Sequence, residues 1–249
     1  EALVALSHIP SLRSMELALS VLNQSMDRYL EYALTLTVNA LREIWEPAYA
    51  AGRFDFGGPD RLSFVVGAVP SEGAAGELLV QLMDGRVSHK DRSEVVQLIA
   101  QNGNPQVLAD LVRFAEDNFD APLLTETMEA LTVAARERNV IPARNLGFPR
   151  GQFAHRNERL KAAAIRLAGA WGREMHGIFR NYLSLGSPLI DAAVVNGLAY
   201  LGDEKSREVL IEITETSSRD LQIQATGALA SIDLPEASRR AAAGAHRGT

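Results

Sequence analysis

The sequence feature that most constrains the fold is a helix, turn and helix unit over residues 187–216, with related units on both sides of it. Ser187 can cap the first helix and Pro188 can occupy its first position, where the missing N–H costs nothing. Gly202 can end that helix in a left-handed conformation, and Asp203 can cap the second. Apolar residues recur at spacings of three and four on each helix: Ile190, Ala193, Val194, Gly197, Leu198 and Leu201, then Val209, Leu210 and Ile213. Neither helix can bury its apolar stripe alone.

The unit repeats along the chain. Residues 170–172 (Ala-Trp-Gly) align with residues 200–202 (Tyr-Leu-Gly), and the pair 198–199 aligns with the pair 229–230, which gives a period of 30 to 31 residues. Two short helices per period, separated by glycine or aspartate, are typical of an α-solenoid. No strand-like alternation with hairpin turns is present. The sequence therefore predicts an all-α chain, a right-handed α-solenoid of about six or seven antiparallel helix pairs.

We expect one continuous array over residues 1–249, with residues 1–10 as the end of a helix. Residues 1–138 form its less regular part, with helices predicted at 11–23, 27–45, 60–69, 73–84, 88–102, 105–117 and 121–138. Regular repeats are predicted over 158–244, with helices at 158–171, 173–184, 188–201, 204–216, 218–232 and 235–244. Residues 139–157, rich in proline and glycine, form a long inserted loop, and residues 245–249 form a disordered tail.

The predicted helix 27–45 is the most apolar. Tyr29, Tyr32 and Leu36 widen its apolar surface to a second side, so we expect other elements to pack on both sides of it. Glu46-Pro47 is predicted to break or kink it.

Composition excludes several classes of function. The chain has no cysteine, which rules out disulfides, thiolate metal sites and cysteine nucleophiles. Its net charge of −6 argues against nucleic acid held along the whole length. Its apolar runs fall short of the roughly 18 residues of a membrane span, so we expect no membrane insertion of this segment. The chain begins at Glu1 without a charged-then-apolar leader, which fits a processed protein or an excised piece of a longer one.

No motif for catalysis or for a cofactor is present. The five histidines, His8, His89, His155, His176 and His246, are never three or four residues apart, so we expect no metal site. No Gly-x-Ser-x-Gly elbow occurs, and no serine, histidine and acid can be grouped from the sequence. Asp55 and Asp60 could bind calcium or simply cap helices, and Glu208 and Glu212 fit a solvated helix face. A lyase-like or glycosylase-like enzyme would need an acid in a cleft beside aromatics, which the sequence does not show.

One segment carries an unusual charge. Over residues 136–161, seven basic residues against two acidic ones give a net charge of +5, inside a chain whose total is −6. If the side chains converge they attract anions, with Phe148 and Phe153 available to stack or anchor a partner. The alternative is that the arginines lie over the helices and pair with acids of neighbouring repeats. The candidate interaction patch consists of Arg138, Arg144, Arg150, His155, Arg156 and Arg159.

A second candidate is the aromatic loop around Phe54 and Phe56, flanked by Gly52, Gly57 and Gly58. These two rings can tuck under the array and seal a gap between repeats. Exposed, they would form a contact for a partner. Trp45 and Trp171 fall on apolar stripes and are expected in the core.

Two resemblances add to this interpretation. The alanine-rich helix followed by Leu-Gly-Asp, residues 192–203, resembles a HEAT or armadillo-like repeat, with weaker copies at 158–184 and 218–244. Residues 26–34 (Met-Asp-Arg-Tyr-Leu-Glu-Tyr-Ala-Leu), together with Trp-Glu-Pro-Ala at 45–48, Ala-Gly at 51–52 and Phe-Gly-Gly at 56–58, are similar to a segment of large bacterial multidomain proteins of the PVC type. These are described as membrane-bound dehydrogenases or haem-binding CxxCH proteins.

The resemblance implies that this chain is a middle module, with a β-propeller before it and a cytochrome c domain after it, in an exported or periplasmic protein. The chain has no CxxCH motif and no propeller blades, so neither haem attachment nor dehydrogenase activity carries over to it. We therefore expect a non-catalytic protein-interaction, scaffold or spacer module that contacts a partner protein or neighbouring domains of the same polypeptide. The alternative is anion or nucleic-acid binding through the basic segment.

Overall fold

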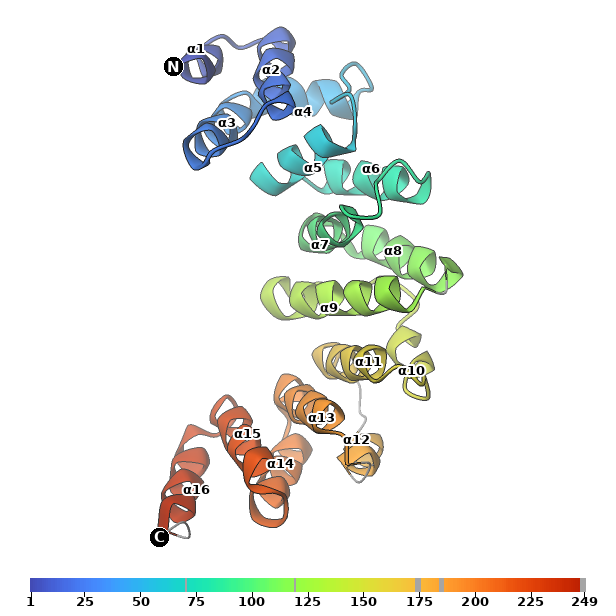
Figure 1. The fold of residues 1–249 in the computed structure, drawn as a ribbon, viewed down its shortest axis with the longest axis vertical. Helices are drawn as coiled ribbons and strands as arrows, with labels where there is room; N and C mark the ends of the chain where they lie inside the picture. Colours follow the sequence, from blue (N-terminus) through green and yellow to red (C-terminus); the bar gives the residue numbers. More distant parts are fainter. Residues whose placement is uncertain (70, 119, 173–175, 184–185, 247–249) are drawn as a thin grey trace. The chain divides into compact units, whose positions relative to one another are not determined.

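The protein, seen in a computed structural model that describes residues 1–69, 71–118, 120–172, 176–183 and 186–246, is all-helical (Figure 1). Those residues form sixteen α-helices and one short 3-10 helix, and no strand. The helices gather into two compact units, Glu1–Leu111 and Val112–Thr249. The all-α prediction is therefore confirmed.

The N-terminal unit is built from helices that pack on their neighbours in the chain. Helix α1 contacts α2 and α3, α3 contacts α5, and α5 contacts α6 and α7. The Thr37 hydroxyl of α3 donates to the Leu3 carbonyl of α1 (3.0 Å), which joins the first and third helices. The helices are α1 (Ala2–Ser7), α2 (Leu12–Leu19), η1 (Ser20–Asn23), α3 (Arg28–Ala40), α4 (Arg42–Ala50), α5 (Pro59–Ala68), α6 (Glu72–Met83), α7 (Arg92–Asn102) and α8 (Pro105–Asn118), the last of which continues into the second unit.

The predicted helix 27–45 is two helices, because the chain turns at Leu41 between α3 and α4. Leu41 is fully buried, and the indole N–H of Trp45 donates to the Val38 carbonyl (2.9 Å) across the turn. Pro47, predicted to break the helix, lies inside α4 instead. Pro47 has no N–H, so one intrahelical hydrogen bond is lost there, and the helix ends three residues later at Ala50.

The second apolar side of α3 is not covered. The side chains of Tyr29, Tyr32 and Leu36 are 84%, 65% and 51% exposed, so the prediction that other elements pack on both sides of this helix is wrong. The side that does pack buries Leu34, Thr37 and Val38.

The C-terminal unit shows a regular order of contacts. Helices α9, α11, α13 and α15 each contact the next of that series, while α10 packs on α11, α12 on α13 and α14, and α16 on α15. Their bounds are α9 (Ala121–Arg138), α10 (Phe148–Gly151), α11 (Glu158–Ala170), α12 (His176–Leu183), α13 (Pro188–Leu201), α14 (Glu204–Thr216), α15 (Arg219–Ala230) and α16 (Leu234–His246). Helices α9, α13 and α14 have the predicted bounds.

The α13–α14 unit forms as its sequence predicts, with one exception. Gly202 ends α13 in the left-handed conformation (φ 65°), and the Asp203 carboxylate caps α14 by accepting from the Ser206 N–H (2.8 Å). Ser187 does not cap its own helix through its side chain. Its hydroxyl donates to the Glu158 carboxylate instead (3.0 Å), which links the starts of α13 and α11.

Helices α11 and α13 meet backbone to backbone. A Cβ atom added at Gly169 would lie 2.3 Å from the Gly197 carbonyl oxygen and 2.6 Å from the Gly197 Cα. Only glycine leaves room for so close an approach. This contact brings together the buried alanine-rich face of α11 and the buried face of α13.

The predicted loop 139–157 packs against the rest of the C-terminal unit and contains one helical turn, α10. Asn139 ends α9 in the left-handed conformation, and Pro142, Phe148 and Phe153 are buried. Residues 245 and 246, predicted as a disordered tail, belong to α16. Residues 247–249 of that tail, and 173–175 and 184 of the predicted helix 173–184, lie outside the described residues.

Candidate functional site

Four of the six residues of the predicted interaction patch lie in one corner of the C-terminal unit, where α10 packs on α11. Arg150 is on α10, Arg156 is in the turn that follows, and Arg159 is in the first turn of α11; all three are exposed. The His155 Nδ1 accepts from the Asn157 N–H (3.0 Å), and the Asn157 side chain caps α11. We call Arg150, His155, Arg156 and Arg159 the arginine corner.

The other basic side chains of residues 136–161 have different surroundings. Arg136 lies over the Tyr200 ring (4.2 Å to its centroid), and Lys161 lies 5.8 Å from the Tyr182 centroid. Arg138, in the last turn of α9, is half-buried, and Arg144 is exposed. The basic segment therefore divides between packing against tyrosines and an exposed corner.

The aromatic residues of this segment are not available to a partner. Phe148 and Phe153 are buried, and the Phe153 ring packs edge-on against Tyr182 (6.0 Å between centroids). The Tyr182 hydroxyl also donates to the Phe153 carbonyl (2.8 Å). The prediction that these two rings stack on or anchor a partner is wrong, because they fix the segment to the unit instead.

The aromatic loop is also internal. Phe54 and Phe56 are buried and lie 5.1 Å apart, and Phe56 contacts Trp45 (5.6 Å) and Tyr49 (4.7 Å). Apolar rings between flexible glycines fold inward because burial removes their area from water. The prediction of a partner contact at Phe54 and Phe56 is wrong, and the two rings pack inside the N-terminal unit, as the alternative had it.

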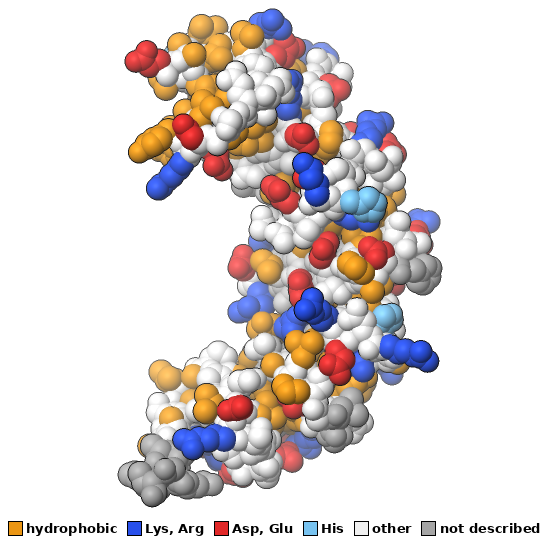
Figure 2. Space-filling view, viewed as in Figure 1, with side chains coloured by type: hydrophobic (Ala, Val, Ile, Leu, Met, Phe, Trp, Pro, Cys, Tyr) orange, Lys and Arg blue, Asp and Glu red, His pale blue; other side chains and the backbone are white. Residues whose placement is uncertain are grey.

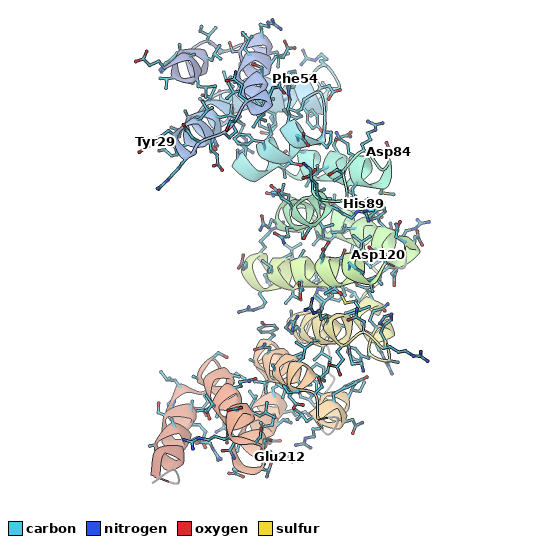
Figure 3. The ribbon with its side chains drawn as sticks, viewed as in Figure 1. Tyr29, Phe54, Asp84, His89, Asp120 and Glu212 are labelled. Atoms are coloured by element: carbon cyan, nitrogen blue, oxygen red, sulfur yellow. The ribbon has the colours of Figure 1, made fainter. Side chains whose placement is uncertain are left out.

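An exposed apolar surface lies on α3 of the N-terminal unit. Tyr29, Tyr32 and Leu36 share one side of the helix at spacings of three and four residues. We call these three residues the α3 face. Figure 3 shows Tyr29 at the free edge of α3, and in Figure 2 apolar side chains gather over α1–α3. A shallow hollow of about 580 Å³ beside the face is lined by Arg28, Tyr29, Glu31, Tyr32 and Thr35.

The structure also groups a histidine, an acid and a serine, which the sequence did not show. The His176 Nε2 lies 2.9 Å from Asp203 Oδ1 and 3.1 Å from Ser206 Oγ. Burial alone would raise the pKa of Asp203, but hydrogen bonds from Ser206 and His176 lower it below its ordinary value. Ser206 is fully buried, and the acid and the hydroxyl meet the same ring nitrogen. In that geometry the histidine cannot pass a proton from the serine to the acid, so we assign the three residues a structural role. They join α12 to the start of α14.

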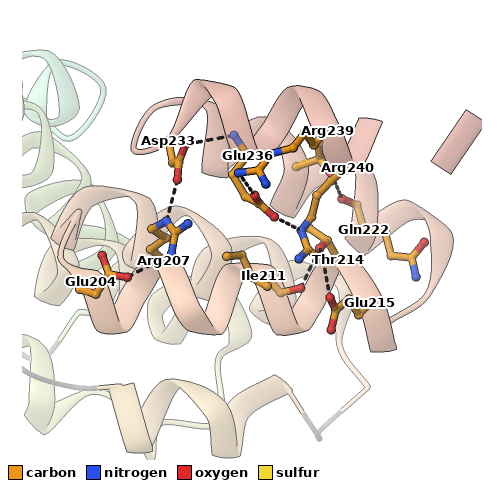
Figure 4. Close-up of polar contacts among 11 residues, drawn as sticks. Glu204, Arg207, Ile211, Thr214, Glu215, Gln222, Asp233, Glu236, Arg239 and Arg240 are labelled. Carbon is orange, nitrogen blue, oxygen red and sulfur yellow. Dashed lines mark hydrogen bonds and ion pairs between the residues drawn. The ribbon is translucent and has the colours of Figure 1, made fainter. Parts of the chain in front are cut away.

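A network of ion pairs joins α14 to α16 (Figure 4). Arg207 bonds Asp233 (2.7 Å) and Glu204 (3.0 Å), and Arg240 bonds Glu236 (2.7 Å) and Glu215 (2.5 Å). The hydrogen bond from the Glu236 N–H and the Arg207 guanidinium hold the pKa of Asp233 below its usual range. Arg239 also pairs with Glu236, and Arg240 also donates to the Thr214 hydroxyl, so several bonds link the last helix to α14.

The remaining acidic candidates are structural as well. The Asp55 carboxylate accepts from the Gly57 N–H (2.9 Å), and Asp60 lies in the first turn of α5, where Gly58 rather than Asp60 is the N-cap. Glu212 pairs with Arg180 (2.8 Å). Within the described ranges no three His, Asp or Glu side chains could together hold a metal ion, and no helix is long and apolar enough to cross a membrane.

Comparisons of the chain with family models, with curated proteins and with solved structures found no match. The α3 face and the arginine corner are therefore interpreted from their own chemistry.

Proposed function

We propose that this chain is a right-handed, HEAT-like α-solenoid that acts as a non-catalytic protein-interaction or spacer module. The order of helix contacts supports the solenoid. In each unit a helix packs on the next helix or the next but one, as in an array whose repeats contact only their neighbours. Such an array offers extended surfaces rather than a deep pocket.

The α3 face is the observation that carries the proposed function. Tyr29 and Tyr32 are largely exposed although they stand on an ordered helix whose other side is buried. Tyrosine combines a large apolar ring with a polar hydroxyl, and it is enriched at the centres of protein interfaces. Other exposed apolar residues include the pair Val80 and Met83 on α6, which has no aromatic member, and Ile223 and Leu234, which lie on separate helices of the other unit. A tyrosine pair with a leucine on one helix side is a docking surface for a protein.

The resemblance to multidomain bacterial proteins involves the same part of the chain. One of its segments, residues 26–34, includes both tyrosines of the α3 face. That resemblance rests on the residues of this chain alone. We therefore propose that the α3 face binds a neighbouring domain of the same exported polypeptide or a separate partner protein.

Site-specific photo-crosslinking tests the proposal. A photoreactive phenylalanine analogue is placed at Tyr32 (65% exposed) and, as a matched control, at Ile223 (63% exposed). Each purified protein is irradiated in an extract of the source cells. We expect one discrete adduct at Tyr32, identified by mass spectrometry and suppressed by excess wild-type chain but not by a Tyr29→Ser/Tyr32→Ser competitor. Equal adducts at both positions, or none at Tyr32, would refute docking at this face.

A further inference from the structure

We propose that the arginine corner binds an acidic segment of a protein partner. This surface belongs to the C-terminal unit and is independent of the α3 face. Arg150, His155, Arg156 and Arg159 lie within ten residues of one another in the sequence, and all four are exposed. In Figure 2 basic side chains and a histidine lie on the surface over α10 and α11.

Among the described residues, no carboxylate forms an ion pair with the guanidinium groups of the corner. Residues 139–157 contain three arginines and no aspartate or glutamate, although the whole chain carries −6. The next carboxylate, Glu158, accepts a hydrogen bond from Ser187 (3.0 Å). In the described part of the chain, Arg150, Arg156 and Arg159 form no ion pair. An anionic partner can therefore pair with these guanidinium groups without first breaking an existing ion pair.

The corner is also held in place, which lowers the entropic cost of binding. Phe148 and Pro149 of α10 are buried, the Tyr182 hydroxyl donates to the Phe153 carbonyl, and the Asn157 side chain accepts from the Arg159 N–H (2.9 Å). The backbone that carries the arginines is thus already ordered before a partner arrives. A pre-ordered surface keeps more of its interaction energy as affinity.

The chemistry of the corner favours carboxylates on a peptide over nucleic acid. Single-stranded nucleic acid is bound by aromatic stacking and a long basic track, whereas Phe148 and Phe153 are buried here and the track is short. Guanidinium groups pair with single carboxylates in bidentate fashion, which suits a short acidic peptide.

Fluorescence anisotropy with a labelled oligoglutamate peptide tests the inference. The corner variant is Arg150→Ala/Arg156→Ala/Arg159→Ala. The control variant, Arg53→Ala/Arg86→Ala/Arg219→Ala, removes the same charge from exposed positions elsewhere. We expect wild type and control to bind at low salt, the corner variant to bind about tenfold more weakly or worse, and binding to weaken as salt is added. An oligoglutamine peptide of the same length should not bind.

Three outcomes would overturn the inference. They are no binding to the wild-type chain, an equal loss in the control variant, and tighter binding of a single-stranded oligonucleotide of matched charge. Circular dichroism checks that the corner variant is folded, and the single change Arg156→Ala, in a turn, repeats the test with least risk to folding. The variant Tyr29→Ser/Tyr32→Ser should bind the peptide like wild type, so failure at one surface is distinguishable from failure at the other.

Discussion

Replacing Gly169 with alanine tests the closest helix contact of the C-terminal unit. The new methyl group would lie 2.3 Å from the Gly197 carbonyl oxygen, far inside van der Waals contact, so α11 and α13 must separate. Overpacking costs about 1–3 kcal/mol, and a backbone obstacle, which cannot rotate aside, places this site near 3 kcal/mol. The better helix propensity of alanine returns about 1 kcal/mol. We expect a net loss of about 2 kcal/mol.

Urea unfolding followed by far-UV circular dichroism measures this change, and a melting curve should shift down by about 4–8 °C. Gly227→Ala on α15 is the matched control, because a Cβ atom there meets nothing within 4 Å. This control should be about 0.5–1 kcal/mol more stable than wild type. If Gly169→Ala is as stable as wild type or the control, the two backbones do not approach as closely as described.

Three further predictions concern polar groups. Burial would raise the pKa of Asp203, but the hydrogen bonds from Ser206 lower it below its ordinary value of 3.8. The ionised carboxylate therefore stabilises the folded protein fully above pH 3.8. This stabilisation is lost as the pH falls through the lower pKa of the folded state. Asp203→Asn should flatten the stability curve in that acid range, as shown by urea midpoints, and an unchanged curve would contradict this. Arg240→Ala removes one of the two arginines that pair with the nearly buried Glu236 carboxylate and leaves the other, Arg239, in place, so we expect a loss of about 1 kcal/mol and faster amide exchange in α16. Unchanged stability and exchange would contradict this. The buried Tyr49 hydroxyl has no hydrogen-bond partner among the described residues, so Tyr49→Phe should unfold at an equal or higher urea concentration. A clearly lower urea midpoint would contradict this.

Much of the helix pattern could be predicted because the chain marks it locally. Pro188, Gly202 and Asp203 each act within one turn of their own position, and the structure uses all three as predicted. The break at Leu41 carries no such mark. The apolar spacing continues across it, and the turn depends on burying Leu41 and on the Trp45 bond to Val38, which are tertiary contacts.

The candidate surfaces could be predicted only in part. The basic segment was visible as a run of arginines, but its division between tyrosine contacts and an open corner depends on Tyr200 and Tyr182, distant in sequence. The pairing of His176 with Asp203 also joins separate helices, so no short motif announces it. The sequence shows that Tyr29 and Tyr32 add an apolar side to α3. Periodicity alone cannot predict whether another element packs on that side, and here both residues are exposed.

The boundary between the two compact units falls between Leu111 and Val112, in the middle of α8 (Pro105–Asn118). A recombinant fragment cut at that boundary would end in half a helix and would bare the apolar residues Leu108 and Leu111 at a frayed end. A shortened N-terminal version for biophysical work should therefore be extended at least to Asn118, so that its last helix is complete.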